Sequence, residues 1–387
     1  MVIKMYRNTF VEINLENIAH NIKTIVKKYD YKYYIGVIKG NCYGHGYGIV
    51  KTLKENGVNF FAVSNLSEAL EVREFDKETG ILCLEPIDIK YLEMCKKNNI
   101  SICVDDYDYY KELVKLNLNI KVHLKIDSGM NRLGFNNKDE VDKVYQDIKK
   151  HKNIYLEGIF THFATSGIYD KNYDNQVDKF KELTSDIDLS KIDIVHLGRS
   201  VSMCLHEKLS FANGIRLGII MYGFSVMPKA NSSLKGKLRE LKWNYLRKKE
   251  NISKIRPYEE LGLKEAFTLV SEVLEIKNVK KGDFIGYGTT YQAKEDMKVA
   301  IVDIGYADGI SRRRRYSKME INGKLYDIVG DVCMGMTMLK VDDTIKKHDK
   351  VIVIGDMMNI RKVARDLGTT SYEVMTMISP LLERKYI

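Results

Sequence analysis

The sequence lacks any long apolar run. None of its 387 residues lies in a stretch that approaches the roughly 18 uninterrupted apolar residues of a membrane span. Residues 1–10 also lack the apolar core of a secretory signal. We therefore expect a soluble protein with no membrane partner.

Closely spaced cysteine pairs are absent as well. The six cysteines lie far apart and form no C-x-x-C pair. Because no small secreted framework surrounds them, we expect reduced thiols in a cytoplasmic protein. No metal site is predicted, and no internal repeat or low-complexity tract occurs.

A strong charge of one sign is also missing. The chain has 62 basic and 52 acidic residues, for a formal net charge of +10. This excess would suit an acidic partner but does not by itself predict nucleic-acid binding. The densest basic run, Arg312–Arg315, is favoured as a solvated surface turn over a phosphate contact.

What is present is a regular alternation of short apolar runs with helical patterns, typical of parallel strands joined by crossover helices. Eight such runs are the number that closes a parallel barrel. The candidate strands are Ile35–Ile38, Phe60–Val63, Ile81–Leu84, Ile102–Val104, Val122–Ile126, Leu156–Thr161, Asp193–Leu197 and Gly214–Arg216. We predict an α/β (β/α)8 TIM-type barrel over residues 1–227, with its chemistry at the carboxyl ends of the strands.

A mainly β C-terminal domain is predicted over residues 228–387. Its candidate strands are Phe267–Ile276, Phe284–Tyr287, Val299–Ile304, Lys318–Ile321 and Val351–Ile354. Residues 231–256 carry leucines at helical spacing among many basic residues. They predict a solvated amphipathic helix more strongly than a segment that docks on an anionic surface.

A glycine-rich stretch, Lys39-Gly40-Asn41-Cys42-Tyr43-Gly44-His45-Gly46, follows the first barrel strand. It fits neither the Walker lysine motif nor the dinucleotide glycine pattern, and by itself it could be a flexible loop. A lysine at the end of an apolar strand is costly to bury as a cation. A Schiff base to an aldehyde cofactor would neutralise Lys39 and create a nucleophile.

This stretch is similar to the V-K-A-N-A-Y-G-H-G signature of the alanine racemases, with Gly40 and Cys42 in place of two alanines. The resemblance runs from the helix around Ile18 to residues 371–374. It implies that Lys39 holds pyridoxal 5'-phosphate covalently and that Tyr43 contributes to the cofactor site.

Residues 123–134 resemble the L-K-x-D-T-G-M-x-R-L-G element of the same family. The resemblance implies that Arg132 binds the substrate carboxylate, a task that suits the planar guanidinium; the alternative is a surface ion pair. Lys125 matches a lysine that is often carbamylated in the family. Carbamylation would give Arg132 an anionic neighbour.

Two further strand ends match family motifs. Residues 161–164 match T-H-F-A, which implies that His162 lies beside the cofactor ring, although a lone histidine is usually just a hydrogen-bonding group. Residues 196–200 resemble H-x-A-N-S, which implies that Ser200 binds the cofactor phosphate and His196 supports an arginine. Arg199 stands where the family has asparagine.

Residues 214–223 resemble V-R-P-G-I-x-L-Y-G, with Leu217 in place of proline. The resemblance implies that the N–H groups of Gly218 and Ile219 bind the phosphate and that Arg216 donates to the pyridine nitrogen. Arginine does not give up its proton, so the ring stays a weaker electron sink. This favours simple proton return, and hence racemisation.

Racemisation needs acid–base groups on both faces of the substrate Cα, and one lysine serves one face. Residues 286–291 match Y-G-x-T-Y, which implies that Tyr291 is the second base. Without that motif, Tyr291 would be assigned to packing. In the family this tyrosine reaches the other subunit, so the resemblance implies a homodimer with shared active sites.

Three more residues follow from the resemblance. Tyr306, in a segment close to I-G-Y-A-D-G, would line the substrate entrance, and Tyr372 would bind the phosphate. Met334, in a segment similar to G-R-x-x-M-D, would offer its N–H to the substrate carboxylate. Gly335 replaces the aspartate of that motif.

The resemblance thus predicts an amino-acid racemase that interconverts L- and D-alanine by a two-base mechanism and supplies D-alanine for peptidoglycan. A serine or broader-specificity racemase is the alternative: Tyr372 favours the smaller alanine pocket, and Gly335 leaves serine open. The β domain argues against a non-catalytic cofactor-binding barrel, Arg216 argues against a related decarboxylase, and nucleic-acid binding ranks last.

Overall fold

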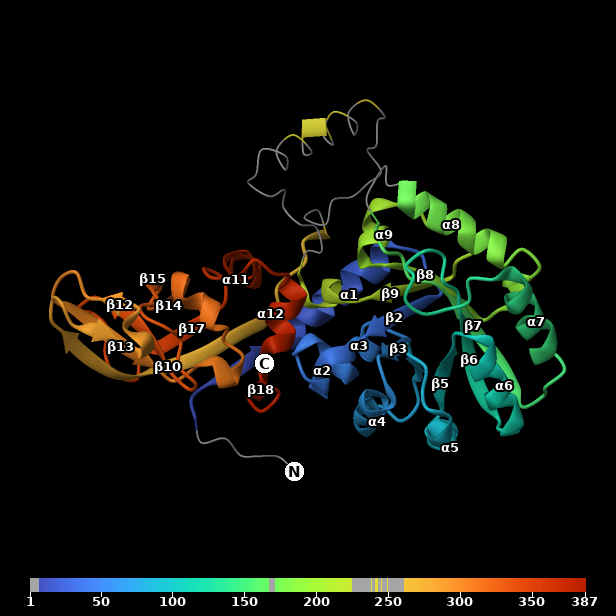
Figure 1. Ribbon diagram of the computed structural model, residues 1–387, viewed down its shortest axis with the longest axis horizontal. Coiled ribbons are helices and arrows are strands. Elements are labelled where there is room, and N and C mark those ends of the chain that lie inside the picture. Colours follow the sequence, from blue (N-terminus) through green and yellow to red (C-terminus); the bar gives the residue numbers. More distant parts are fainter. Residues whose placement is uncertain are drawn as a thin grey trace. The chain divides into compact units, whose positions relative to one another are not determined.

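The computed structural model describes residues 7–166, 171–224 and 261–387, together with residues 238, 241, 242, 245 and 249. The described chain forms two compact units. The barrel unit contains residues 17–39 and those described between 50 and 264. The sheet unit contains residues 7–16, 40–49 and 265–387. Figure 1 labels the elements of both.

Eight parallel strands close the barrel in chain order, and the last strand returns to pair with the first. The strands are β2 (Tyr33–Val37), β3 (Phe60–Val63), β4 (Gly80–Cys83), β5 (Ile100–Val104), β6 (Ile120–Lys125), β7 (Ile154–Phe160), β8 (Ile194–Arg199) and β9 (Gly214–Leu217). Parallel strands covered by helices are apolar on both faces, and every residue of β3 and β5 is buried. The (β/α)8 prediction is confirmed.

The longer helices around the barrel strands bury one face each. In α1 (Leu15–Lys28), Ile18, Ile22 and Ile25 are buried at helical spacing. Side chains cap several helices; Asn65 accepts a backbone N–H at the start of α4, and Asp106 does so at α6. The other helices up to residue 205 are α2 (Lys39–Tyr43), α3 (Val50–Glu55), α4 (Leu66–Phe75), α5 (Leu92–Lys97), α6 (Tyr107–Lys115), α7 (Lys138–Ile148), α8 (Lys171–Leu183) and α9 (Ser200–Leu205).

The sheet unit is mainly β, as predicted. Its larger sheet has the order β15-β14-β17-β10-β1-β18, and β13 joins β10 to β16. A two-stranded ribbon pairs β11 with β12. The strands are β1 (Phe10–Ile13), β10 (Phe267–Val279), β11 (Phe284–Ile285), β12 (Tyr291–Gln292), β13 (Met297–Val302), β14 (Lys318–Ile321), β15 (Lys324–Asp327), β16 (Thr337–Val341), β17 (Lys350–Ile354) and β18 (Glu383–Tyr386), with helices α11 (Ile360–Leu367) and α12 (Ser371–Met377). Because β1 lies between β10 and β18, the start of the described chain belongs to this unit.

Two details of the sequence prediction are wrong. The strand expected over Phe284–Tyr287 ends at Ile285, because Gly286 has φ +77° and leads into a 3-10 turn. The arginine run is not fully solvated. Arg314 is buried, and its Nη2 donates to the carbonyl oxygens of Lys318 at 2.9 Å and Val353 at 3.0 Å.

Several predictions reach beyond the described residues. The boundary near residue 227 lies outside them and stays a prediction, as does most of the helix expected over 231–256. The described Leu238, Leu241 and Tyr245 are helical with exposed side chains. None of the helices in the described parts is long and apolar enough to cross a bilayer, and no disulfide joins any of the six cysteines.

Candidate active site

Lys39 follows β2, and the chain then makes a left-handed turn. Gly40, Asn41, Cys42 and Tyr43 have φ values of 61°, 53°, 54° and 53°. A non-glycine residue in this conformation costs roughly 1–2 kcal/mol, and such strain persists only where neighbouring structure holds it. The turn therefore fixes the path of the chain directly after the half-buried Lys39.

In the sheet unit, the turn brings Tyr43, a predicted cofactor-site residue, close to Tyr372, the predicted phosphate-binding tyrosine. The ring centroids of Tyr43 and Tyr372 lie 5.8 Å apart. Gly44 allows this approach, because a Cβ there would lie 2.3 Å from the carbonyl oxygen of Met375 in α12. The loop and α12 thus pack backbone against backbone, which holds both phenols in one place.

Arg132 lies in a loop organised by Asp127, a residue that sequence reasoning missed. One carboxylate oxygen of Asp127 accepts the N–H groups of Gly129, Met130 and Asn131 at 2.9–3.0 Å, and the other accepts that of Arg132 at 3.0 Å. Asp-Ser-Gly is a recognisable turn signal that could have identified it. Asp127 fixes the Arg132 backbone while the Arg132 side chain stays exposed.

Lys125 is buried at the end of β6 and donates to the carbonyl oxygen of Leu84 at 3.0 Å. Burial is the main cause that lowers the pKa of Lys125. Cys103 opposes this effect, Arg132 adds to it, and Asp105 and Arg216 make smaller contributions of opposite sign. A small hollow is lined by Lys125, Ile126, Asp127, Met130, Arg132, Leu133, Thr161 and His162. Predicted residues from two strand ends therefore face one space.

Arg216 is buried on β9 with its guanidinium fixed at several points. Its Nη1 donates to His196 Nδ1 and to the His196 carbonyl oxygen, both at 2.7 Å. Its Nη2 donates to the carbonyl oxygens of Thr161 at 2.7 Å and Leu197 at 2.9 Å. Burial, and after it the nearby Arg199 cation, lower the pKa of Arg216 to about 9, so the group stays protonated at neutral pH.

His162 lies beside this guanidinium, with Nδ1 3.4 Å from Arg216 Nη2. Burial lowers the pKa of His162 to about 2, and the cations of Arg216, Arg199, Arg132 and Lys39 act in the same direction. His162 is therefore a neutral imidazole in a strongly cationic surrounding. Such a site suits an anionic ligand.

Behind Arg216, the contact with His196 continues into a buried polar chain through His123 to Glu157, and sequence reasoning missed this continuation. His196 Nε2 lies 3.1 Å from His123 Nδ1, and His123 Nε2 lies 3.1 Å from Glu157 Oε2. All three side chains are buried. A glutamate in an otherwise apolar barrel strand was the available signal, since a buried carboxylate requires hydrogen-bond partners.

The ends of β8 and β9 form a potential anion site. The Gly218 N–H donates to Ser200 Oγ at 3.1 Å, and a 3-10 helix begins at Ile219 without a side-chain cap. Arg199 is paired with Arg216 in the strand register. Its Nε is buried without a hydrogen-bond partner among the described residues. Uncapped N–H groups, a hydroxyl and a spare cation are a donor set for phosphate.

In the sheet unit, Tyr291 is half-buried on β12, paired with Ile285 of β11. It packs against the cluster Ile285, Ala293, Met297, Val299, Val329 and Met338. Gly286 permits the preceding turn, because its φ is +77° and a Cβ would lie 2.8 Å from Met338 Cε. The turn and the cluster together fix the start of β12, and with it the tyrosine.

Tyr306 and Met334 are neighbours in the sheet unit. The Tyr306 N–H donates to the carbonyl oxygen of Cys333, and the Ala307 N–H donates to that of Met334, both at 2.9 Å. The side chains of Tyr306 and Met334 are 44% and 62% exposed, which leaves them available to a ligand. Gly335 is open, because nothing lies within 4 Å of a Cβ built there.

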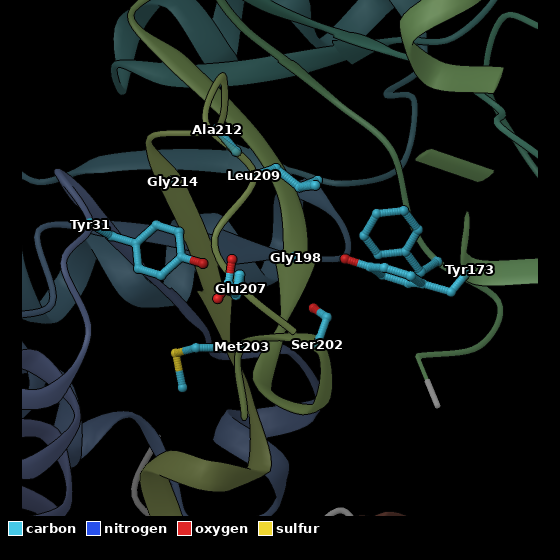
Figure 2. Close-up of a pocket in the computed structure, with 10 residues that line it drawn as sticks. Tyr31, Tyr173, Gly198, Ser202, Met203, Glu207, Leu209, Ala212 and Gly214 are labelled. Carbon is cyan, nitrogen blue, oxygen red and sulfur yellow. The ribbon is translucent and has the colours of Figure 1, made fainter. Parts of the chain in front are cut away.

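A different hollow of the barrel unit contains none of the predicted residues. It is lined by Tyr31, Phe163, Tyr173, Gly198, Ser202, Met203, Glu207, Leu209, Ala212 and Gly214 (Figure 2). In the close-up, the phenols of Tyr31 and Tyr173 come from opposite sides of β8 and β9. The predicted chemistry gathers instead around Lys125, Arg132, His162 and Arg216.

Comparison with known proteins identifies similar sequences along nearly the full length. Residues 13–226 match the family model "Alanine racemase, N-terminal domain", and residues 266–386 match "Alanine racemase, C-terminal domain". The alanine racemase of Listeria monocytogenes serotype 4b (strain F2365) is 33% identical over 395 residues, covering 100% of both chains. The crystal structure of alanine racemase from E. faecalis has a TM-score of 0.88 at 29% identity, with 100% of both chains covered. A histidine racemase from Leuconostoc mesenteroides subsp. sake shares the fold, with a TM-score of 0.84, 24% identity and 100% of both chains covered.

Proposed function

This chain belongs to the alanine racemase family, and we propose that it interconverts L- and D-alanine with pyridoxal 5'-phosphate as cofactor. The observation that carries the proposal is the buried Arg216, with its guanidinium fixed by His196 and by backbone carbonyl oxygens. A donor of this kind, protonated at neutral pH, suits the pyridine nitrogen of a cofactor whose substrate exchanges its Cα proton and keeps its carboxylate.

The residues of the barrel unit fit the phosphate group. The Gly218 N–H, which donates to the Ser200 hydroxyl, and the Ile219 N–H, at a helix start without a side-chain cap, would bind the phosphate together with that hydroxyl. Arg199 adds a cation at the same strand end. In the sheet unit, the paired phenols of Tyr43 and Tyr372 are further donors. Lys39 would hold the cofactor, and His162 would lie beside its ring.

In the proposed reaction, each residue has one task. Bound pyridoxal phosphate acidifies the substrate Cα–H by withdrawing electron density. Lys39 Nζ takes the proton from one face of Cα, and Tyr291 Oη returns one to the opposite face; for the other enantiomer the roles are reversed. Arg132 and the Met334 N–H hold the substrate carboxylate, and Tyr306 limits the entrance.

A second copy of the chain completes the proposal. Lys39 belongs to the barrel unit and Tyr291 to the sheet unit, and we propose that Tyr291 of the partner subunit serves Lys39 in a homodimer. We further propose that Lys125 is carbamylated, because its lowered pKa increases the fraction of neutral amine that can react with carbon dioxide, and Arg132 would pair with the product. A cytoplasmic enzyme that supplies D-alanine for peptidoglycan remains the proposed context.

A serine or broader-specificity racemase is the second candidate. The open space at Gly335 favours it, since the aspartate of the family motif is missing there. The test is to incubate the purified protein and pyridoxal phosphate with L-alanine or L-serine and to separate the enantiomers by chiral chromatography. Faster conversion of alanine supports the first candidate, and faster conversion of serine supports the second.

The cofactor needs its own test. A lysine-bound pyridoxal phosphate gives an absorption band near the visible edge, and Lys39→Ala should lose the band together with racemisation. A protein without this band in the wild type would contradict the proposal.

A further inference from the structure

A chain of buried hydrogen bonds, here called the relay, extends from Arg216 through His196 and His123 to Glu157. Its three steps are Arg216 Nη1 to His196 Nδ1 at 2.7 Å, His196 Nε2 to His123 Nδ1 at 3.1 Å, and His123 Nε2 to Glu157 Oε2 at 3.1 Å. The side chains come from β9, β8, β6 and β7 of one barrel. The relay therefore joins the proposed cofactor contact to a carboxylate deeper in the same unit.

The relay admits one arrangement of protons. Arginine only donates, so His196 Nδ1 must accept, and the proton of a neutral His196 lies on Nε2. That proton is donated to His123 Nδ1, which must also accept. His123 is then neutral with its proton on Nε2, directed at Glu157. A protonated His123 would place two donors face to face.

Glu157 provides the acceptor that ends the relay. Its Oε2 also accepts from the hydroxyl of Ser101, and its Oε1 lies 3.3 Å from the Lys121 ammonium. Burial would raise the pKa of Glu157, but the hydrogen bonds from His123 and Ser101 and the charge of Lys121 act against burial and lower the pKa below its usual range. The carboxylate is thus an obligate acceptor at neutral pH.

We propose that Glu157 is a remote positioning residue for the reaction, because it holds His123 and His196 as Nε2–H tautomers and so keeps His196 Nδ1 as the acceptor of Arg216. The inference rests on the proposed function only where Arg216 meets the cofactor. Neither His123 nor Glu157 lies at a strand end beside the predicted site residues. Both therefore act on Arg216 only through His196.

The structure predicts what Glu157→Gln would do. Lys121 requires the amide oxygen on its side, so the amide NH2 group would face His123. His123 Nε2 would then have to accept a hydrogen bond, so the proton of His123 would move to its Nδ1. That proton would be donated to His196 Nε2, which leaves the proton of His196 on Nδ1, facing the Arg216 N–H donor. Adding Lys121→Met removes the cation, so the amide can rotate and restore the original tautomers.

Nitrogen NMR of histidine-labelled holoenzyme tests this directly. Coupling between nitrogens across the shared hydrogen bond identifies His196 and His123, and His45, whose Nδ1 lies 3.0 Å from the carbonyl oxygen of Cys42, is an internal Nδ1–H reference. We expect Nε2–H tautomers in the wild type and in Lys121→Met, Nδ1–H in Glu157→Gln, and Nε2–H again in the double variant. A wild-type His196 with its proton on Nδ1 overturns the proposal without any variant.

Kinetic measurements on the same variants distinguish a positioning role of Glu157 from a role in packing alone. Glu157→Gln should lower kcat/KM by about tenfold or more, since an arginine donor loses its acceptor, and the double variant should recover most of it. A loss of activity with unchanged tautomers, or changed tautomers with full activity and full cofactor affinity, overturns the proposal. If the wild type does not racemise alanine but the tautomers respond as predicted, the proposed function fails and the relay stands.

Discussion

Gly305 controls whether Tyr306 and Met334 can lie together. Its φ of −147° suits any residue, so an alanine would meet no backbone penalty. Its Cβ would, however, lie 2.3 Å from the carbonyl oxygen of Cys333 and 2.4 Å from that of Met334. Backbone atoms at that distance must retreat by about 1 Å to reach ordinary contact. Gly305→Ala is therefore a purely steric perturbation of this loop contact.

The same contacts give the expected loss in the free energy of unfolding for Gly305→Ala. Retreat by that distance breaks the two 2.9 Å hydrogen bonds from Tyr306 and Ala307, at about 0.5–1.5 kcal/mol each. Overpacking adds about 1–3 kcal/mol. We expect the free energy of unfolding of the sheet unit to fall by about 2–6 kcal/mol, which lowers its Tm by roughly 5–15 °C.

Calorimetry and kinetics check this prediction together. The KM for alanine should rise, because Tyr306 and Met334 no longer hold their relative positions, while the absorption of the lysine-bound cofactor should persist. Gly335→Ala is the matched control for stability, since the same methyl group meets nothing within 4 Å there. The reasoning is refuted if Gly305→Ala melts with the wild type, or if Gly335→Ala loses as much stability.

Four shorter predictions follow. Tyr291→Phe should lower racemisation by about 10²–10⁴-fold while the cofactor absorption remains, and near-normal turnover would exclude Tyr291 as the second base. Intact-protein mass spectrometry should show a carbon dioxide adduct that Lys125→Ala and acid both remove; an adduct that survives Lys125→Ala would place it elsewhere. Because folding lowers the pKa of Glu157 below its ordinary value of 4.5, the stability that the ionised carboxylate contributes is present above about pH 5 and is lost as the pH falls through the lowered pKa. Urea unfolding of the wild type and Glu157→Gln should converge over that range, and a constant difference would contradict the assignment. Arg199→Asn should weaken binding of pyridoxal phosphate to the apoprotein but leave binding of pyridoxal unchanged, and an equal loss for both would show that Arg199 does not serve the phosphate.

The barrel strands could be predicted from the sequence because a strand buried on both faces is a continuous apolar run. Barrel strands are apolar on both faces, so runs such as Phe60–Val63 were predicted with their observed bounds. Short strands of the sheet unit were harder. β1 and β18 were missed because each has only four residues, because Glu383–Tyr386 is largely exposed, and because the two strands pair from opposite ends of the sequence.

The predicted site residues, with His196 among them, were identified by their motifs. Most of the residues that orient them through hydrogen bonds were not identified from the sequence. Asp127 could have been inferred from local turn chemistry, since its partners lie within five positions. The relay could not, because His123, Glu157 and His196 meet only when three strands are side by side. Arg314 was misjudged for a related reason: its carbonyl acceptors are on β14 and β17, which no local pattern reveals.

The left-handed turn after Lys39 has a consequence for how the molecule matures. Cys42 and Tyr43 disfavour this conformation in a free chain, and the backbone at Gly44 packs against Met375 of α12, more than three hundred residues later in the sequence. The segment that carries Tyr43 therefore gains this contact only after α12 has been made. A nascent chain that already has a finished barrel would still lack the paired rings of Tyr43 and Tyr372 until synthesis is nearly over.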